Sequence, residues 1–140
     1  MEWLSAVTPR IKKTVPNPTL LKWKRFTTLT AARDVFRSTP CIYVQTDSSA
    51  LPIRVGKASL GLEPRYRGGT GYALDAAMHG SGNFVFVAEV PSKECESIER
   101  ELIWQHREAL AYNNVGKRAP PSVRVTLIHE GDAPKFKDEI

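Results

Sequence analysis

Two short apolar runs around a polar loop constrain the fold of this chain most strongly. Residues 41–44 form the first run, residues 54–57 end the second, and residues 46–50 are polar or turn-forming. Two such runs joined by a loop rich in turn formers predict a β-hairpin. The second run closes with Gly56 and then a cation, Lys57. A glycine at the end of a strand indicates a bend or the close approach of a ligand.

The rest of the chain carries further strand and helix signals. The clearest strand is 84–90, which is β-branched, aromatic and almost continuously apolar, so it is expected in the middle of its sheet. Helices are predicted over 27–37, 71–79 and 92–111, and a candidate edge strand over 122–128. Together these elements predict an α+β fold, an α/β sandwich. Its small, mainly antiparallel central sheet of three or more strands is flanked by helices.

The chain divides into three predicted parts. Residues 1–38 are a basic N-terminal extension with a short helix, residues 39–116 hold the domain, and residues 117–140 add a C-terminal strand and a charged tail. Prolines exclude a long helix from the start of the extension. Its basic residues and tryptophans allow two interpretations, an arm along a nucleic-acid backbone or an arm packed on the domain through Trp3 and Trp23.

Composition narrows the class of protein. The 140 residues are 41% hydrophobic and 25% charged, with a formal net charge of +5. This charge favours polyanions such as nucleic acid, although many basic proteins bind none. Cys41 and Cys95 form no CxxC pair, so a zinc ribbon or dithiol redox motif is excluded and two buried, reduced thiols are expected. Without a membrane-length apolar run or a signal peptide, a cytoplasmic protein with no membrane partner is expected.

Two glutamates of the helix predicted over 92–111 have different expected positions. At about 100° per residue, one apolar stripe contains Cys95, Ile98, Leu102, Ala109 and Leu110. Glu99 falls within this stripe, about 40° from its centre, whereas Glu101 lies on the far side and is expected at the surface. A carboxylate among core residues needs a cation, a metal or several donors. Glu99 is therefore either in a structural ion pair, with Arg65 or Lys57, or a ligand of a divalent metal.

The order of these features resembles the GIY-YIG nuclease superfamily over about residues 39–116. Residues 41–43, Cys-Ile-Tyr, stand where that family has Gly-Ile-Tyr, and residues 54–57, Arg-Val-Gly-Lys, resemble its Tyr-Ile-Gly followed by lysine. Residues 80–84, Gly-Ser-Gly-Asn-Phe, are similar to the family's entry into its third strand. The chain departs from the pattern at Cys41, in place of the first glycine, and at Arg54, in place of the second tyrosine.

Three later positions extend the resemblance. The loop arginine of the family matches Arg65, with Arg67 as the alternative. Glu99 matches the metal-binding glutamate. The asparagine that closes the family's module matches Asn113, with Asn114 as the alternative.

The resemblance implies a metal-dependent endonuclease that hydrolyses phosphodiester bonds in DNA, or in RNA. Tyr43 would orient or deprotonate the attacking water, Arg65 would bind the scissile phosphate, and Glu99 would hold a single Mg²⁺ or Mn²⁺. Lys57 would lower the pKa of a tyrosine or contact phosphate. Tyr43 is expected to point across at Glu99, with Gly56 leaving room. The remaining implied substrate contacts are Arg54, Arg67, His79 and Asn113.

Other interpretations remain open. The chain is alternatively a catalytically inactive GIY-YIG-like module that binds nucleic acid or protein, which the substitution at Arg54 supports. It is alternatively a basic α/β domain of unrelated fold. Taken alone, Tyr43 is better explained as a core tyrosine, and Arg65 and Arg67 as surface charges. Both a monomer and a dimer are compatible with the sequence.

Overall fold

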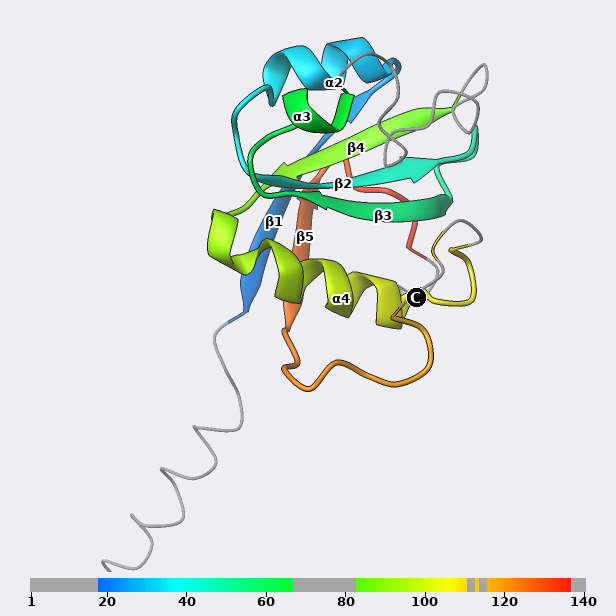
Figure 1. Ribbon diagram of the computed structural model, residues 1–140. Helices are drawn as coiled ribbons and strands as arrows, with labels where there is room; N and C mark the ends of the chain where they lie inside the picture. Colours follow the sequence, from blue (N-terminus) through cyan, green and yellow to red (C-terminus); the bar gives the residue numbers. More distant parts are fainter. Residues whose placement is uncertain (1–17, 67–82, 111–112, 114–115, 137–140) are drawn as a thin grey trace, which may run out of the picture.

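The described strands of this protein form one mixed sheet. A computed structural model describes residues 18–66, 83–110, 113 and 116–136. The five-stranded sheet has the order β3-β2-β4-β1-β5 (Figure 1). Its strands are β1 (Thr19–Phe26), β2 (Cys41–Thr46), β3 (Pro52–Ala58), β4 (Phe84–Glu89) and β5 (Leu127–Gly131). Since only β1 and β5 are parallel, the sheet is mainly antiparallel, and the predicted α+β class is confirmed.

Helices lie on both faces of the sheet. α2 (Leu29–Val35) and α3 (Glu63–Tyr66) lie on one face, and α4 (Cys95–Gln105) covers the other after a 3₁₀ turn, η4 (Ser92–Glu94) (Figure 1). Thr28 caps α2, because its Oγ1 accepts a hydrogen bond from Ala31 N at 3.1 Å. The helix predicted over 71–79 lies outside the described residues. In the part of the chain that is described, no helix is both long and apolar enough to cross a membrane.

The sequence pattern predicts most of the sheet but not its first strand. β2 and β3 form the expected hairpin, β4 is the middle strand, and β5 is an edge strand that begins later than predicted. β1 falls within residues 1–38, which the sequence predicts as an extension with a short helix. Its side chains alternate, with Leu21 and Trp23 buried and Lys22 and Lys24 exposed, which is the period of a strand.

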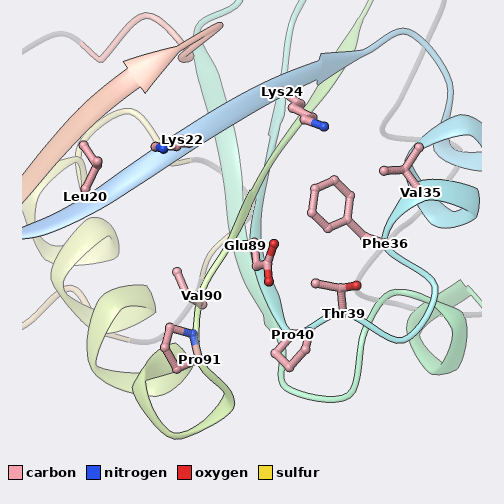
Figure 2. A pocket seen from close by; sticks show the side chains of 10 residues that line it. All are labelled: Leu20, Lys22, Lys24, Val35, Phe36, Thr39, Pro40, Glu89, Val90 and Pro91. Carbon is pink, nitrogen blue, oxygen red and sulfur yellow. The ribbon is translucent and has the colours of Figure 1, made fainter.

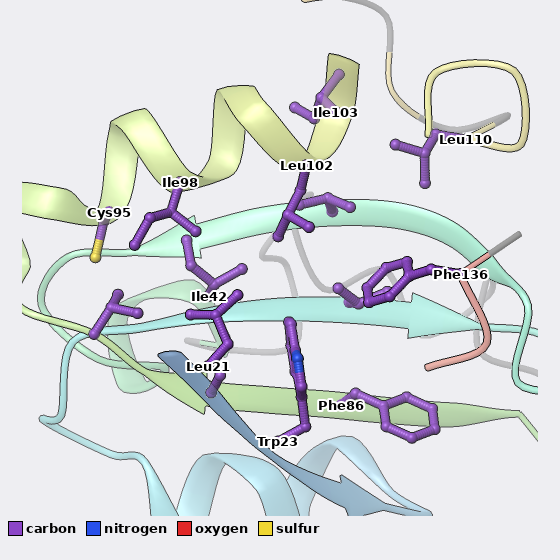
Figure 3. Packing of buried hydrophobic residues seen from close by; sticks show 14 residues of the cluster. Leu21, Trp23, Ile42, Phe86, Cys95, Ile98, Leu102, Ile103, Leu110 and Phe136 are labelled. Carbon is purple, nitrogen blue, oxygen red and sulfur yellow. The ribbon is translucent and has the colours of Figure 1, made fainter. Parts of the chain in front are cut away.

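The sheet separates two hydrophobic clusters. Ile42 and Val44 of β2 belong to the cluster beneath α4, where Figure 3 shows Ile98 and Leu102 of that helix above Ile42. Tyr43 belongs to the opposite cluster, which also contains residues of α2. Consecutive side chains of a strand point to opposite faces, so neighbours in sequence enter different cores.

Both cysteines are buried free thiols, as predicted. Burial, with smaller effects from Cys95 and Glu89, raises the pKa of Cys41 to about 12. Burial also raises the pKa of Cys95. Because the thiolate is the reactive form of cysteine, both side chains act as core residues rather than as nucleophiles.

Candidate functional site

A cleft lies between α4, the end of β3 and residues 116–122. Its volume is about 430 Å³. The charged side chains that line it are Lys57 from β3 and Glu96, Glu99 and Arg100 from α4. The cleft therefore brings together two of the predicted site residues, Lys57 and Glu99, which come from different elements.

Glu96 organises the cations of this cleft. Its Oε1 lies 3.7 Å from Lys57 Nζ, and its Oε2 lies 2.6 Å from Arg100 Nη2. All three side chains are partly exposed, so these ion pairs contribute only about 0–1 kcal/mol each to stability. Their effect is to hold two positive groups beside Glu99, which lies one turn after Glu96 on the same side of α4.

Glu99 is a carboxylate of this cleft that fits a metal ligand. It is half-buried and lines the cleft, and its carboxylate is a hard oxygen ligand of the kind that Mg²⁺ and Mn²⁺ prefer. Among the described residues, no group of three His, Cys, Asp or Glu side chains is placed to hold a metal. Mg²⁺ is commonly held through one or two carboxylates and its own waters, so Glu99 fits a site with a single protein carboxylate.

The prediction that Glu101 is a surface charge is wrong. Its side chain is 1% exposed, whereas Glu99 is only half-buried. α4 ends at Gln105, so two residues counted in the apolar stripe, Ala109 and Leu110, do not belong to the helix. Ile103 of α4 is also buried, and with it the centre of the apolar stripe of this helix lies about 45° from Glu99 and about 115° from Glu101. The stripe therefore still favours burial of Glu99, and it is the contacts of Glu101 that decide which carboxylate is buried.

Glu101 is buried because its carboxylate is fully hydrogen-bonded. Oε1 accepts from Arg124 Nε at 2.9 Å and from Val125 N at 3.1 Å. Oε2 accepts from Arg124 Nη2 at 2.8 Å and from Gln105 Nε2 at 2.7 Å. Burial alone would raise the pKa of Glu101, but these donors outweigh burial and lower the pKa. Glu101 thus holds Arg124 and Val125, which follow the cleft wall, against α4.

The prediction that Tyr43 points across at Glu99 is also wrong. Tyr43 is 1% exposed and packs in the cluster on the α2 side, while α4 packs against the other face. Gly56, its partner on β3, leaves room for the side chain of Tyr43 itself. A Cβ on Gly56 would lie 2.3 Å from Tyr43 Cζ and Oη. The close approach that this glycine indicated is made by a core side chain.

Asn113 has a structural contact with the hairpin. Its Oδ1 accepts from Val55 N at 2.8 Å, and its Nδ2 donates to Val55 O at 2.9 Å. The amide therefore pairs with β3, the edge strand, as one residue of a neighbouring strand would. Asn113 holds the strand that carries Lys57 rather than facing the cleft. Its alternative, Asn114, lies outside the described residues.

Of the remaining predicted site residues, only Arg54 has a described side chain, and it does not line the cleft. Arg54 is half-buried on β3 and pairs with Gln45 across the hairpin, on the same face as Tyr43. Arg65 lies in α3, but its side chain is outside the description. Arg67 and His79 both lie outside the described residues.

Gln45 is an unusual residue that the sequence pattern did not single out. It is 0% exposed, and among the described residues neither its Oε1 nor its Nε2 has a hydrogen-bond partner. An unpaired buried amide costs roughly 1–3 kcal/mol. Every residue of β2 is buried, so the strand lacks the alternation that would have drawn attention to a polar position.

A Gln45→Met variant is expected to be more stable than the wild type by about 1–2 kcal/mol, because methionine has a similar shape and no groups that need hydrogen bonds. Urea denaturation measures the change. Gln105→Met is the matched control and is expected to destabilise, since Gln105 Nε2 donates to Glu101 at 2.7 Å. A loss of stability in both variants would contradict this account of Gln45.

A larger groove lies on the opposite face of the sheet. Its volume is about 610 Å³, and Figure 2 shows Lys22 and Lys24 of β1 along one side, with Val35 of α2 and the following Phe36 across from them. Glu89, at the end of β4, lies between the two sides. None of the predicted site residues lines this groove.

Comparison of the chain with protein-family models, with curated proteins and with solved structures found no match in any of the three.

Proposed function

We propose that this chain is a GIY-YIG-like domain that binds nucleic acid at the cleft around Lys57 and Glu99 and hydrolyses phosphodiester bonds there. The single observation that carries the proposal is that Lys57 and Glu99 line one cleft. Both occupy positions that resemble functional positions of that family. The antiparallel order β3-β2-β4, followed by α4, agrees with the expected sequence of hairpin, third strand and glutamate-bearing helix.

Each charged group of the cleft has a task in this reaction. Hydrolysis requires neutralisation of charge on the phosphoryl oxygens and help for the water and the leaving oxygen. The Lys57 ammonium would bind a phosphoryl oxygen, and the Arg100 guanidinium would bind an adjacent phosphate. A divalent cation held by Glu99 would supply Lewis-acid activation and lower the pKa of water. Glu96 would keep both basic groups in place when no substrate is bound.

A second candidate is a non-catalytic nucleic-acid-binding module. It is favoured by the burial of Tyr43 on the face opposite α4, which removes the phenol expected to handle the water. It is also favoured by Arg54 in place of the family's second tyrosine. The two candidates share the cleft and differ only in whether bound nucleic acid is cut.

Plasmid DNA incubated with the protein and Mg²⁺ or Mn²⁺ is expected to be nicked or linearised. Glu99→Gln is expected to lower the rate by more than about 100-fold, because it removes the charge that holds the cation. Lys57→Met is expected to lower it by about tenfold or more through loss of phosphate charge neutralisation. Agarose-gel assays of initial rates measure both effects.

Two variants control this assay. Glu108→Gln removes an exposed carboxylate beyond the end of α4 and is expected to leave cleavage unchanged. Tyr43→Phe is expected to retain cleavage, since its phenol is on the other face of the sheet. Binding of DNA without cleavage under both metals would contradict hydrolysis and support the second candidate.

A further inference from the structure

The two edge strands of the sheet differ in how they are protected against pairing. At β3, Asn113 occupies the backbone N–H and C=O of Val55 at 2.8 and 2.9 Å. The same strand begins with Pro52, shifts its register with β2 and carries Lys57. Covering groups, prolines, bulges and lysines all keep edge strands from pairing with other chains. β5 is the other edge strand, and residues 127–131 contain no proline or lysine and keep an unbroken register with β1.

The backbone of β5 offers hydrogen-bonding groups on its outer side. Thr19 N donates to Thr126 O at 2.8 Å, so Thr126 and the residues two and four positions after it turn their backbone groups toward β1. Alternate residues of a strand direct their N–H and C=O to opposite sides, so those of Leu127 and His129 are directed away from β1. Within the described residues, β5 ends the sheet. An edge of this kind is a template for one more strand.

The side chains along this edge are apolar and charge-balanced. Ile128 is 45% exposed, and the register of β5 with β1 places it beside Leu20, which is 42% exposed. The same register places Glu130 beside Lys22, so one charge of each sign lies next to the apolar pair. Exposed apolar side chains on a surface without net charge favour a protein partner.

We propose that β5 pairs antiparallel with β5 of a second copy of this chain, with Ile128 of both copies on the two-fold axis. A two-fold dimer uses the same surface of both subunits, so the strand must be complementary to itself. In this register the two exposed Ile128 side chains meet, and Thr126 of each copy lies opposite Glu130 of the other. Leu127 lies opposite His129 of the other copy, and these two form the hydrogen-bonded pairs, since both direct their backbone groups outward.

Charge selects this register over its neighbour. With Ile128 on the axis, the two Glu130 carboxylates are four residues apart along the strands, about 13 Å. With His129 on the axis, the two imidazoles would face each other and each Ile128 would lie opposite a Glu130. Like groups that titrate to the same charge destabilise a strand pair when they are directly opposite, and an apolar side chain gains nothing from a carboxylate.

The dimer is independent of the proposed function. Pairing through β5 leaves β3 as the outermost strand at each end of the combined sheet. Lys57 of the candidate cleft lies on β3, so the paired edge does not include it.

Sedimentation equilibrium of the full chain over a range of concentrations tests the dimer. The wild type is expected to approach twice the chain mass of 15.6 kDa at high concentration and to dissociate on dilution. Ile128→Lys places two ammonium groups on the axis and is expected to weaken association by about tenfold or more. Val35→Lys is the matched control, since Val35 is 53% exposed on α2, and it is expected to leave association unchanged.

Cysteine cross-linking tests the register. Directly opposite residues of a non-hydrogen-bonded antiparallel pair have Cα atoms about 4.5 Å apart, which a disulfide can span. Ile128→Cys is therefore expected to form a covalent dimer when treated with glutathione disulfide, as seen on a non-reducing gel. Glu130→Cys is the control and is expected to remain uncross-linked, because its counterpart is about 13 Å away. Cys41 and Cys95 are buried and do not compete.

The outcomes are decisive whether or not the protein cleaves DNA. A wild type that is monomeric at every concentration would overturn the dimer in favour of a strand from a different protein. A dimer that Ile128→Lys leaves intact, or equal cross-linking of the two cysteine variants, would overturn the pairing of β5 around Ile128. Cross-linking of Ile128→Cys alone would support the dimer even in a protein without nuclease activity.

Discussion

A Glu101→Ala variant is expected to lose about 3 kcal/mol of unfolding free energy, because its carboxylate is buried and accepts hydrogen bonds from three residues. Alanine would leave the backbone N–H of Val125 without its acceptor at 3.1 Å. It would also release the Arg124 side chain from both carboxylate oxygens, which it contacts at 2.9 and 2.8 Å. Chemical denaturation followed by circular dichroism measures the loss.

The matched control for this variant is Glu108→Ala, which removes an exposed carboxylate from the turn after α4. Exposed positions away from such contacts change stability by less than about 0.5 kcal/mol. A similar loss in the two variants would show that the hydrogen bonds of Glu101 do not account for its contribution to the unfolding free energy.

The contribution of Glu101 is expected to depend on pH in one direction. Its pKa in the folded protein is lowered from the ordinary value of 4.5. A lowered pKa means that the stabilisation is fully present above about pH 4.5 and is lost as the pH falls through the folded-state value. The stability difference between the wild type and Glu101→Gln is therefore expected to shrink on acidification. A difference that grows below about pH 4 would contradict the assignment.

Glu101 also has a consequence for the cleft. By holding Arg124 and Val125 against α4, it fixes the chain that follows the cleft wall at residues 116–122. The buried carboxylate is therefore a structural support for the side on which Glu99 and Lys57 are exposed. Glu101 thus anchors the chain that follows the wall, and Glu99, two positions earlier, lines the cleft.

The sequence pattern predicts those parts of the fold that depend on local signals. β4 is apolar and β-branched throughout, and α2 has a threonine cap, so both are found where expected. β1 is not predicted, because nearby prolines and lysines indicate an irregular extension. The sequence signal for this strand is the alternation of Leu21 and Trp23 with Lys22 and Lys24.

The candidate site could be predicted only in part, because the residues predicted wrongly owe their positions to tertiary packing. β2 is buried on both faces, so nothing in its sequence tells which face α4 covers and which face Tyr43 enters. The exchange of Glu99 and Glu101 follows from contacts outside α4, since Arg124 and Val125, which donate to Glu101, lie far along the chain. Lys57, one of the two cations suggested as partners of Glu99, lines the same cleft, where it forms an ion pair with Glu96 at 3.7 Å.

A Gly56→Ala variant is expected to destabilise the protein by about 3 kcal/mol, because its new methyl group would overlap the ring of Tyr43. The Cβ would lie 2.3 Å from Cζ and Oη and 2.6 Å from Cε1. Tyr43 is 1% exposed and packs among residues such as Leu62 and Val87, so the ring has little space into which to move. Urea denaturation gives the loss directly.

A double-mutant cycle isolates this clash. Tyr43→Leu removes the three side-chain atoms that the methyl group would meet, so Gly56→Ala on that background is expected to cost less than about 1 kcal/mol. Relief of this kind would establish that Gly56 is required by Tyr43 and not by a ligand at the hairpin. An equal cost on both backgrounds would contradict this. It would support the prediction that Gly56 leaves space for a bound molecule. The cycle therefore tests the stability of the hairpin and also decides whether Tyr43 belongs to the core or to a site.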